Sequence, residues 1–131
     1  DDGIDEETAA EFTNYGTTTK GSQLLQIIFG GEKVFNNPKP IELIKHILKI
    51  AAKNDSVILD SFAGSGTTGA VAHKMGRRWI MAELGEHCHT HIIPRLTKVI
   101  DGADPGGDRS PPRNRSSAFS FSKTNAPFSY P

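Results

Sequence analysis

Cysteines and long apolar runs are scarce in this 131-residue sequence, and their scarcity excludes several classes of protein. The single cysteine, Cys88, rules out a disulfide framework within the chain, which suits a reducing cytoplasm. No apolar stretch approaches the roughly 18 residues that a membrane-spanning helix needs. The N-terminus carries no signal-peptide pattern. We therefore expect a soluble cytoplasmic protein with no membrane partner.

A net charge is also lacking, because 15 Lys or Arg balance 15 Asp or Glu. The two signs are nevertheless separated along the chain. Residues 1–19 carry six acidic side chains and no Lys or Arg, whereas residues 20–100 carry eleven Lys or Arg and six Asp or Glu. A basic centre beside an acidic segment suggests a polyanionic partner, although solvated helix faces explain these charges equally well.

Composition divides the chain into three parts. Apolar residues make up 36% of the sequence, and most of them fall between Leu24 and Ile100. Residues 1–19 are acidic and polar, so we expect a flexible segment there. Residues 106–131 are rich in Gly, Pro, Ser, Asn and Arg, so we expect a disordered tail. Residues 20–105 should therefore form the one folded, ligand-binding domain.

The order of elements in this domain predicts a parallel α/β fold. Residues 23–29 are too short a run for their period to separate helix from strand. After them, apolar periodicity and turn residues predict five alternating elements. They are a helix from about Pro40 to Asn54, a strand over 56–60, a helix over 67–75, a strand over 78–83, and a helix from about 86 that Pro94 interrupts. This strand–helix–strand unit predicts a partial Rossmann-like sheet whose first strand is apolar on both faces.

Ligand-binding chemistry is concentrated at the ends of the two expected strands. Gly64 and Gly66 let the backbone approach a ligand closely, because a Cβ there would collide with the ligand or forbid the dihedral angles. The N–H groups at the start of the following helix can bind a carboxylate or phosphate. Glu83 closes the second strand 19 residues after Gly64, where an acid accepts hydrogen bonds from ribose hydroxyls. The pattern predicts a nucleotide-like ligand.

Residues 64–69 also match the dinucleotide fingerprint G-x-G-x-x-G, so a nicotinamide-dinucleotide-binding oxidoreductase fragment is an alternative. Against it, four residues from Asp60 to Ala63 separate the strand from the first glycine. The Asp60 carboxylate would repel a pyrophosphate but suits the ammonium group of a bound amino acid. A P-loop is excluded, because no lysine follows the glycines.

Several motifs resemble those of amino-DNA methyltransferases. Residues 59–69 (LDSFAGSGTTG) resemble the S-adenosylmethionine motif, and residues 35–43 (FNNPKPIEL) resemble the motif that precedes it in permuted members. Segments 20–31, 85–86 and 95–100 are similar to modification subunits of type III restriction–modification systems. By this resemblance the chain is identified as the C-terminal, cofactor-binding part of a DNA adenine-N6 methyltransferase.

The resemblance implies S-adenosylmethionine as cofactor and, for the intact enzyme, direct methyl transfer to the N6 amine of a flipped adenine in double-stranded DNA. It leaves a restriction subunit and a homodimer open as partners. Plain packing is the alternative role for Phe62 and Pro40, and a surface acid is the alternative for Glu83. The residues that would bind the cofactor are Lys39, Pro40, Asp60, Phe62, Ala63, Gly64, Ser65, Gly66, Thr67, Thr68 and Glu83.

The catalytic motif of that family, Asp or Asn followed by two prolines and an aromatic residue, is absent from the sequence. Residues 36–39 (NNPK) lack the second proline and the aromatic ring. In the permuted order this motif lies N-terminal to the present segment. We therefore expect no catalytic residue in this chain and no activity of the chain alone, and an inert fragment that needs a partner chain is a further hypothesis.

A group of histidines around Cys88 raises the question of a metal site. His87 and His91 stand four residues apart and would share one face of the expected helix, where they could share zinc. A structural zinc site takes four ligands from separate elements, and the sequence holds no second group. We therefore expect no metal and interpret these histidines as a solvated helix start.

Overall fold

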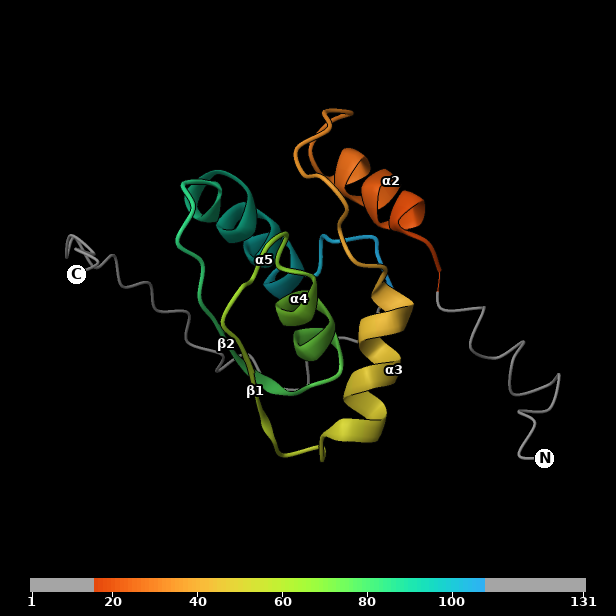
Figure 1. The fold of residues 1–131 in the computed structure, drawn as a ribbon, viewed down its shortest axis with the longest axis vertical. Helices are drawn as coiled ribbons and strands as arrows, with labels where there is room; N and C mark the ends of the chain where they lie inside the picture. Colours follow the sequence, from red (N-terminus) through yellow and green to blue (C-terminus); the bar gives the residue numbers. More distant parts are fainter. Residues whose placement is uncertain (1–15, 108–131) are drawn as a thin grey trace, which may run out of the picture.

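The computed structural model describes residues 16–107, which form a two-stranded parallel sheet with helices packed beside it (Figure 1). The expectations for residues 1–15 and 108–131 lie outside the described residues. In chain order the elements are α2 (Thr18–Ile28), α3 (Ile41–Ala51), β1 (Val57–Asp60), α4 (Thr67–Lys74), β2 (Arg78–Met81), the π-helix η1 (Cys88–Ile92) and α5 (Ile93–Ile100).

The ambiguous run at residues 23–29 is part of a helix, α2, that begins earlier than its apolar pattern suggested. Thr17 caps this helix, because its side-chain oxygen accepts a hydrogen bond from the backbone N–H of Lys20 at 3.3 Å. The helix buries Leu25 and Ile28, and Gly21 lies against the backbone of Pro38. The cap at Thr17 marks the start of the helix, which the periodicity of residues 23–29 did not reveal.

The next helix, α3, begins where the sequence predicted but ends at Ala51 rather than at Asn54. Ala52 has an extended backbone, and its N–H donates the last helical hydrogen bond to Leu48. The buried guanidinium of Arg77 also donates to the carbonyl of Leu48, so the end of α3 is tied to the loop after α4. This contact comes from 29 residues further along the chain, which local sequence does not reveal.

The sheet consists of β1 and β2, paired in parallel from Val57 opposite Arg78 to Asp60 opposite Met81. The first strand is apolar on both faces, as predicted, but it is not buried on both faces as a central parallel strand would be. Ile58 is buried, whereas Val57 and Leu59 are 45% and 66% exposed. The reason is that α4 packs on one face of the strands, and no described element covers the other face between residues 16 and 107.

The core gathers around α4, whose small residues allow close packing on two sides. One cluster joins Ala63, Ala70, Ile92, Leu96 and Val99, and the other joins Leu48, Ile58, Val71 and Ala72. Trp79 of β2 packs against both clusters. Because α4 contributes to each, it holds α3, the sheet and α5 in fixed positions around the loop at its N-terminus.

The predicted helix from residue 86 is replaced by a π-helical turn that passes into α5. The N–H of Ile93 bonds the carbonyl of Cys88, five residues earlier. Pro94 has no N–H to donate, so it fits the first turn of α5 and not a helix interior. No helix within residues 16–107 is long and apolar enough to cross a membrane.

Candidate functional site

The carboxyl ends of β1 and β2 bring the glycine-rich loop and Glu83 into direct contact. The backbone N–H of Gly64 donates to Glu83 Oε2 at 2.9 Å, and the N–H of Gly85 donates to Oε1 at 3.0 Å. The ring nitrogen Nε2 of His87 lies 3.3 Å from Oε2. The two parts of the predicted site, 19 residues apart in sequence, are therefore joined by a hydrogen bond.

The strand that should end at Glu83 is shorter than expected, since β2 ends at Met81. Ala82 continues the pairing, because its N–H donates to Asp60 and its carbonyl accepts from Ala63, both at 2.9 Å. Glu83 therefore stands just beyond the strand end, at the same edge of the sheet as the glycine-rich loop. The predicted position of the acid holds, although the strand boundary differs by two residues.

The contacts of Glu83 stabilise its carboxylate. Partial burial acts to raise the pKa of Glu83, but the backbone N–H groups of Gly85 and Gly64 and the neighbouring His87 outweigh it. The pKa of Glu83 consequently lies below its ordinary value, and the group is ionised at neutral pH. A carboxylate oxygen can accept about two hydrogen bonds, and Oε1 accepts one, from Gly85, so the group keeps capacity for a ligand hydroxyl.

The glycine-rich loop has a backbone shape that other residues adopt with difficulty. Gly64 and Gly66 have positive φ angles of 56° and 76°. A tight turn closes the loop, because the N–H of Gly66 donates to the carbonyl of Ala63 at 2.7 Å. Gly66 then leads into α4, whose first N–H groups have no acceptor within the helix. These N–H groups are suited to a negatively charged ligand group.

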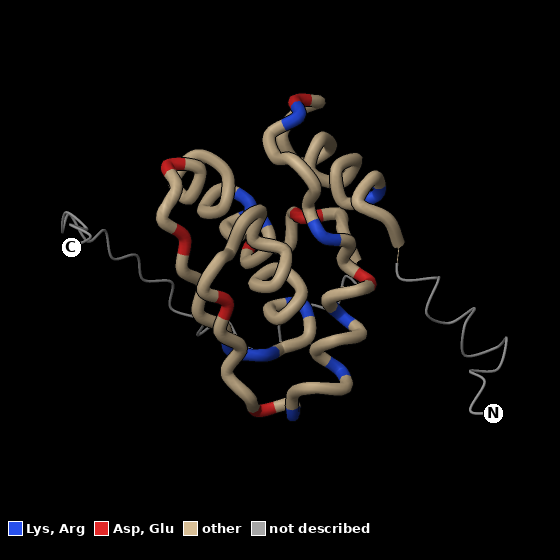
Figure 2. Tube along the Cα trace, in the orientation of Figure 1, with Lys and Arg blue, Asp and Glu red and all other residues tan. Residues whose placement is uncertain are grey.

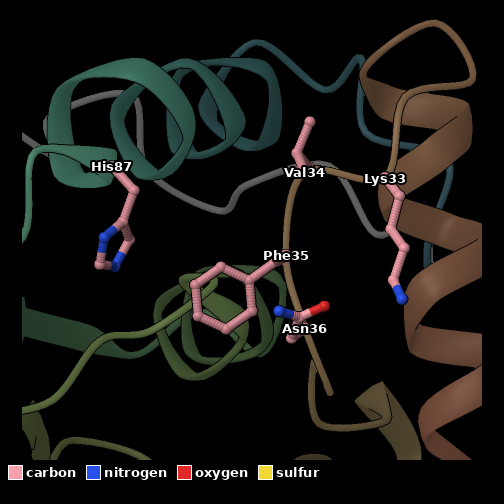
Figure 3. A pocket seen from close by; sticks show the side chains of 5 residues that line it. All are labelled: Lys33, Val34, Phe35, Asn36 and His87. Atoms are coloured by element: carbon pink, nitrogen blue, oxygen red, sulfur yellow. The ribbon is translucent and has the colours of Figure 1, made fainter.

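A pocket of about 300 Å³ lies beside this loop. Figure 3 shows two of its side chains, Phe35 and His87, directed toward each other, and their ring centroids are 5.5 Å apart. Phe35 also borders Gly64, since a Cβ on that glycine would lie 3.6 Å from the phenyl ring. The pocket therefore adjoins both Gly64 and the Glu83–His87 pair. It is lined by Lys33, Val34, Phe35, Asn36 and His87.

None of the eleven predicted cofactor-binding residues lines this pocket directly. Asp60 accepts a hydrogen bond from the backbone N–H of Phe62 at 3.0 Å, and Phe62 itself is 88% exposed. Few described residues therefore contact its side chain. Lys39 is exposed, whereas Pro40 is buried at the start of α3.

Three side chains of the predicted loop point into the protein interior. Ala63 belongs to the core cluster beneath the loop. Ser65 and Thr67 are buried, their hydroxyl oxygens lie 3.0 Å apart, and both face the guanidinium of Arg95. Their side chains are thus occupied by protein contacts, and what they offer a ligand is backbone. Thr68 is partly buried in the first turn of α4.

Sequence reasoning did not assign the residues that support the site. Phe35 stood in a recognised motif but received no role, and His87 was considered only as a metal ligand. Arg95 belongs to the segment 95–100 that resembles modification subunits, but it was assigned no role. Asp104 lies just before the expected disordered tail and was assigned none either. The signal that was available for His87 was its position four residues after Glu83, which brings the ring back to the carboxylate.

The histidines serve different contacts and form no common ligand set. His87 faces Phe35 and Glu83, whereas His91 packs edge-on against Phe29 with ring centroids 5.5 Å apart. The π-helical turn between them removes the shared helix face that the sequence predicted. In the described part of the chain, no three His, Cys, Asp or Glu side chains are placed to hold a metal ion.

Comparison with known proteins gives one family and a consistent set of relatives. A family model described as DNA methylase matches residues 8–94. The chain is 44% identical over 71 residues to a probable type III restriction-modification enzyme HindVI Mod subunit from Haemophilus influenzae, covering 54% of this chain and 10% of that protein. It is 48% identical over 88 residues to the type III restriction-modification enzyme EcoPI Mod subunit of Escherichia phage P1, covering 66% and 12%. The StyLTI Mod subunit of Salmonella typhimurium is 43% identical over 61 residues, covering 47% and 9%. The chain thus spans about a tenth of the length of these relatives.

Proposed function

Because the chain belongs to the DNA methylase family, we propose that its glycine-rich loop and Glu83 bind S-adenosylmethionine for methyl transfer to adenine N6 in DNA. The family match and the relatives support this reading and do not favour a nicotinamide-dependent oxidoreductase. The expected partial Rossmann-like fold agrees with the parallel pairing of β1 and β2. The same likeness to Mod subunits suggests double-stranded DNA, a restriction subunit and a second copy as partners of the whole protein in the cytoplasm.

The observation that carries the proposal is the bond between the Gly64 N–H and the Glu83 carboxylate. It places an ionised acid within hydrogen-bond distance of a glycine-rich loop, beside a pocket with an aromatic wall. A nucleoside with a charged substituent needs these three features together. The residues present therefore fit S-adenosylmethionine.

Each part of the site has a role that its contacts allow. The free N–H groups at the start of α4 suit the methionine carboxylate, and the acid at the tip of β1, Asp60, suits its ammonium group. Glu83 suits the ribose hydroxyls, because its remaining lone pairs can accept them while Gly64 and Gly85 hold the carboxylate in place. The phenyl ring of Phe35 offers an apolar wall to the base.

The bound cofactor would supply the methyl group, and the residues of this chain would bind and orient it. The catalytic tetrapeptide of the family is absent from the sequence, so we propose that this chain binds the cofactor without transferring the methyl group by itself. Figure 2 shows basic positions along α3 and at the start of β2, and acidic positions elsewhere on the same trace.

The experiment that tests the proposal is calorimetric titration of the chain with S-adenosylmethionine, with NAD as a parallel ligand. We expect saturable binding of S-adenosylmethionine alone. Glu83→Gln should weaken it about tenfold or more, because an amide replaces a charged acceptor and directs N–H groups at the donors it faces. The matched control is Glu86→Gln, an exposed acid three residues away, which should leave the affinity unchanged.

Three outcomes would contradict the proposal. Binding of NAD in place of S-adenosylmethionine would refute the assignment to methyl transfer. Binding of S-adenosylmethionine with equal affinity by the wild type and Glu83→Gln would refute the role of the strand-end acid. A folded wild-type chain that binds neither ligand would show that this segment does not form a cofactor site by itself.

A further inference from the structure

Arg95 is a buried cation whose contacts end on the glycine-rich loop. It lies in α5, its side chain is 1% exposed, and it is among the largest fully buried side chains in the described part of the chain. One guanidinium nitrogen donates to the carbonyl of Ser65 at 2.8 Å and to the Thr67 hydroxyl at 3.0 Å. A positive charge so far from solvent requires an explanation, because a buried charge is costly unless it is paired.

The partner of this charge is Asp104, in the segment that follows α5. Arg95 Nε lies 3.9 Å from Asp104 Oδ2, and both side chains are buried. The other carboxylate oxygen of Asp104 accepts from Lys74 at 2.8 Å and from the backbone N–H of Gly106 at 2.7 Å. Burial lowers the pKa of Arg95 to about 10 and Asp104 opposes this, so the guanidinium remains charged at neutral pH.

The bond from Arg95 controls the orientation of one peptide group in the loop. The peptide between Ser65 and Gly66 is trans, so its carbonyl and its N–H point in opposite directions. Arg95 holds the carbonyl end, and the carbonyl of Ala63 holds the N–H end at 2.7 Å. This peptide sets the positive φ of Gly66 and the direction in which α4 begins. If Arg95 released the carbonyl of Ser65, only the hydrogen bond from the Gly66 N–H to the carbonyl of Ala63 would still hold this peptide group.

An apolar residue would fill the same space at lower cost, since replacing buried ion pairs with packed apolar side chains is often neutral or stabilising. An apolar side chain cannot, however, hold a backbone carbonyl and a hydroxyl at once. The guanidinium does so because its N–H groups are rigidly arranged. The contacts therefore point to loop geometry, and not to core filling, as what Arg95 contributes.

We propose that Arg95 is the positioning residue of the cofactor loop and that Asp104 is its buried counter-ion. The predicted effect of Arg95 on cofactor binding rests on the proposed function, whereas its predicted effect on the geometry of the loop does not. Arg95 touches no ligand in this arrangement and acts through Ser65 and Thr67. It keeps the loop in the conformation that binds S-adenosylmethionine. Most molecules are then already in the binding-competent conformation before the cofactor binds.

The test compares Arg95→Lys with a matched control, Arg77→Lys, in the full 131-residue chain. Both are buried arginines that donate to a backbone carbonyl, but Arg77 bonds Leu48 at the end of α3. Lysine keeps the charge opposite Asp104, but its shorter side chain lacks the fixed pair of N–H groups with which one guanidinium nitrogen donates to Ser65 and Thr67. Amide hydrogen exchange is measured at Gly66, within the loop, and at Met75, at the opposite end of α4. The affinity for S-adenosylmethionine is measured by calorimetry.

Arg95→Lys should speed exchange of the Gly66 amide about tenfold or more, relative to any change at Met75, and should weaken binding of S-adenosylmethionine to a similar degree. Arg77→Lys should leave the Gly66 amide and the affinity unchanged, whatever it does to stability. If Arg95→Lys does not fold, Asp104→Asn replaces it, because an amide in that place removes the buried negative charge opposite the guanidinium. The same loosening at Gly66 is then expected.

Unchanged exchange at Gly66 in the folded variant would overturn the role of Arg95 in the loop, whether or not the chain binds a ligand. Faster exchange with unchanged affinity would overturn its role toward the cofactor. A wild-type chain that does not bind S-adenosylmethionine would refute the proposed function, while exchange at Gly66 would still decide whether Arg95 holds the loop.

Discussion

Replacing Gly66 with alanine should destabilise the protein more than the same replacement at Gly64 or Gly76, which also have positive φ. Gly66 has φ of 76°, a left-handed conformation that costs an L-residue about 1–2 kcal/mol. An alanine Cβ would also lie 3.2 Å from the Cγ2 atom of Ile92, which is 2% exposed and cannot move away freely. Overpacking of this kind costs a further ~1–3 kcal/mol.

Two other glycines separate these contributions. Gly76 has φ of 71° and open space around its Cα, so Gly76→Ala measures the conformational strain alone. Gly64 has φ of 56°, and its Cβ would make an ordinary contact of 3.6 Å with Phe35. Alanine also lowers the entropy of the unfolded chain, which offsets about 0.4–1 kcal/mol in each variant. We therefore expect a loss of about 1 kcal/mol for Gly76→Ala and Gly64→Ala, and about 2–4 kcal/mol for Gly66→Ala.

Urea denaturation followed by circular dichroism measures the free energy of unfolding of the three variants under identical conditions. The comparison is between variants, so errors of extrapolation largely cancel. Equal losses for Gly66→Ala and Gly76→Ala would refute the reasoning, since they would mean that Ile92 yields to the added methyl group. A larger loss at Gly64 than at Gly66 would show that the packing around the loop differs from the structure described.

Two further predictions concern acid stability and the exposed face of the sheet. The pKa of Glu83 in the folded protein lies below its ordinary value of 4.5, so its stabilising contribution should be complete above that pH and lost as the pH falls through the lower value. Urea midpoints measured at neutral pH and below pH 4.5 should therefore differ less in Glu83→Gln than in the wild type, and an identical acid response would contradict this account. On β1, Ile58→Ala should cost about 2–4 kcal/mol, because this side chain is 8% exposed. Leu59→Ala should cost under about 1 kcal/mol in the same urea assay, because Leu59 is 66% exposed; similar losses at the two positions would show that the second face is covered.

Local chemistry explains why the glycine-rich loop and Glu83 could be predicted. Glycine at a positive φ and an acid after a strand are requirements of single positions, and each is visible in the residue type. Parallel strands then place their carboxyl ends at one edge, so the contact between Gly64 and Glu83 follows from the element order. The cofactor class came from the resemblance of whole motifs, which the family match supports.

Side-chain direction within the loop could not be predicted in the same way. Ser65 and Thr67 are polar residues in a ligand-binding motif, so lining the ligand was the natural expectation. The structure turns them toward Arg95, about thirty residues further along, because a buried guanidinium needs acceptors that α5 itself does not offer. The local sequence of the loop does not indicate which distant side chain will donate hydrogen bonds to Ser65 and Thr67.

What the sequence determined by itself is the order of β1, α4 and β2, their parallel pairing and the position of the glycine-rich loop beside a strand-end acid, because these follow from local periodicity and residue type. Only the tertiary structure decided that the described elements leave one sheet face uncovered, that a π-helical turn precedes Pro94, and that Lys74, Arg95 and Asp104 form a buried ionic network. These features depend on which surfaces meet across long separations in the chain. The energy of a buried charge or an exposed leucine is set by its neighbours in space, which the order of residues alone does not specify.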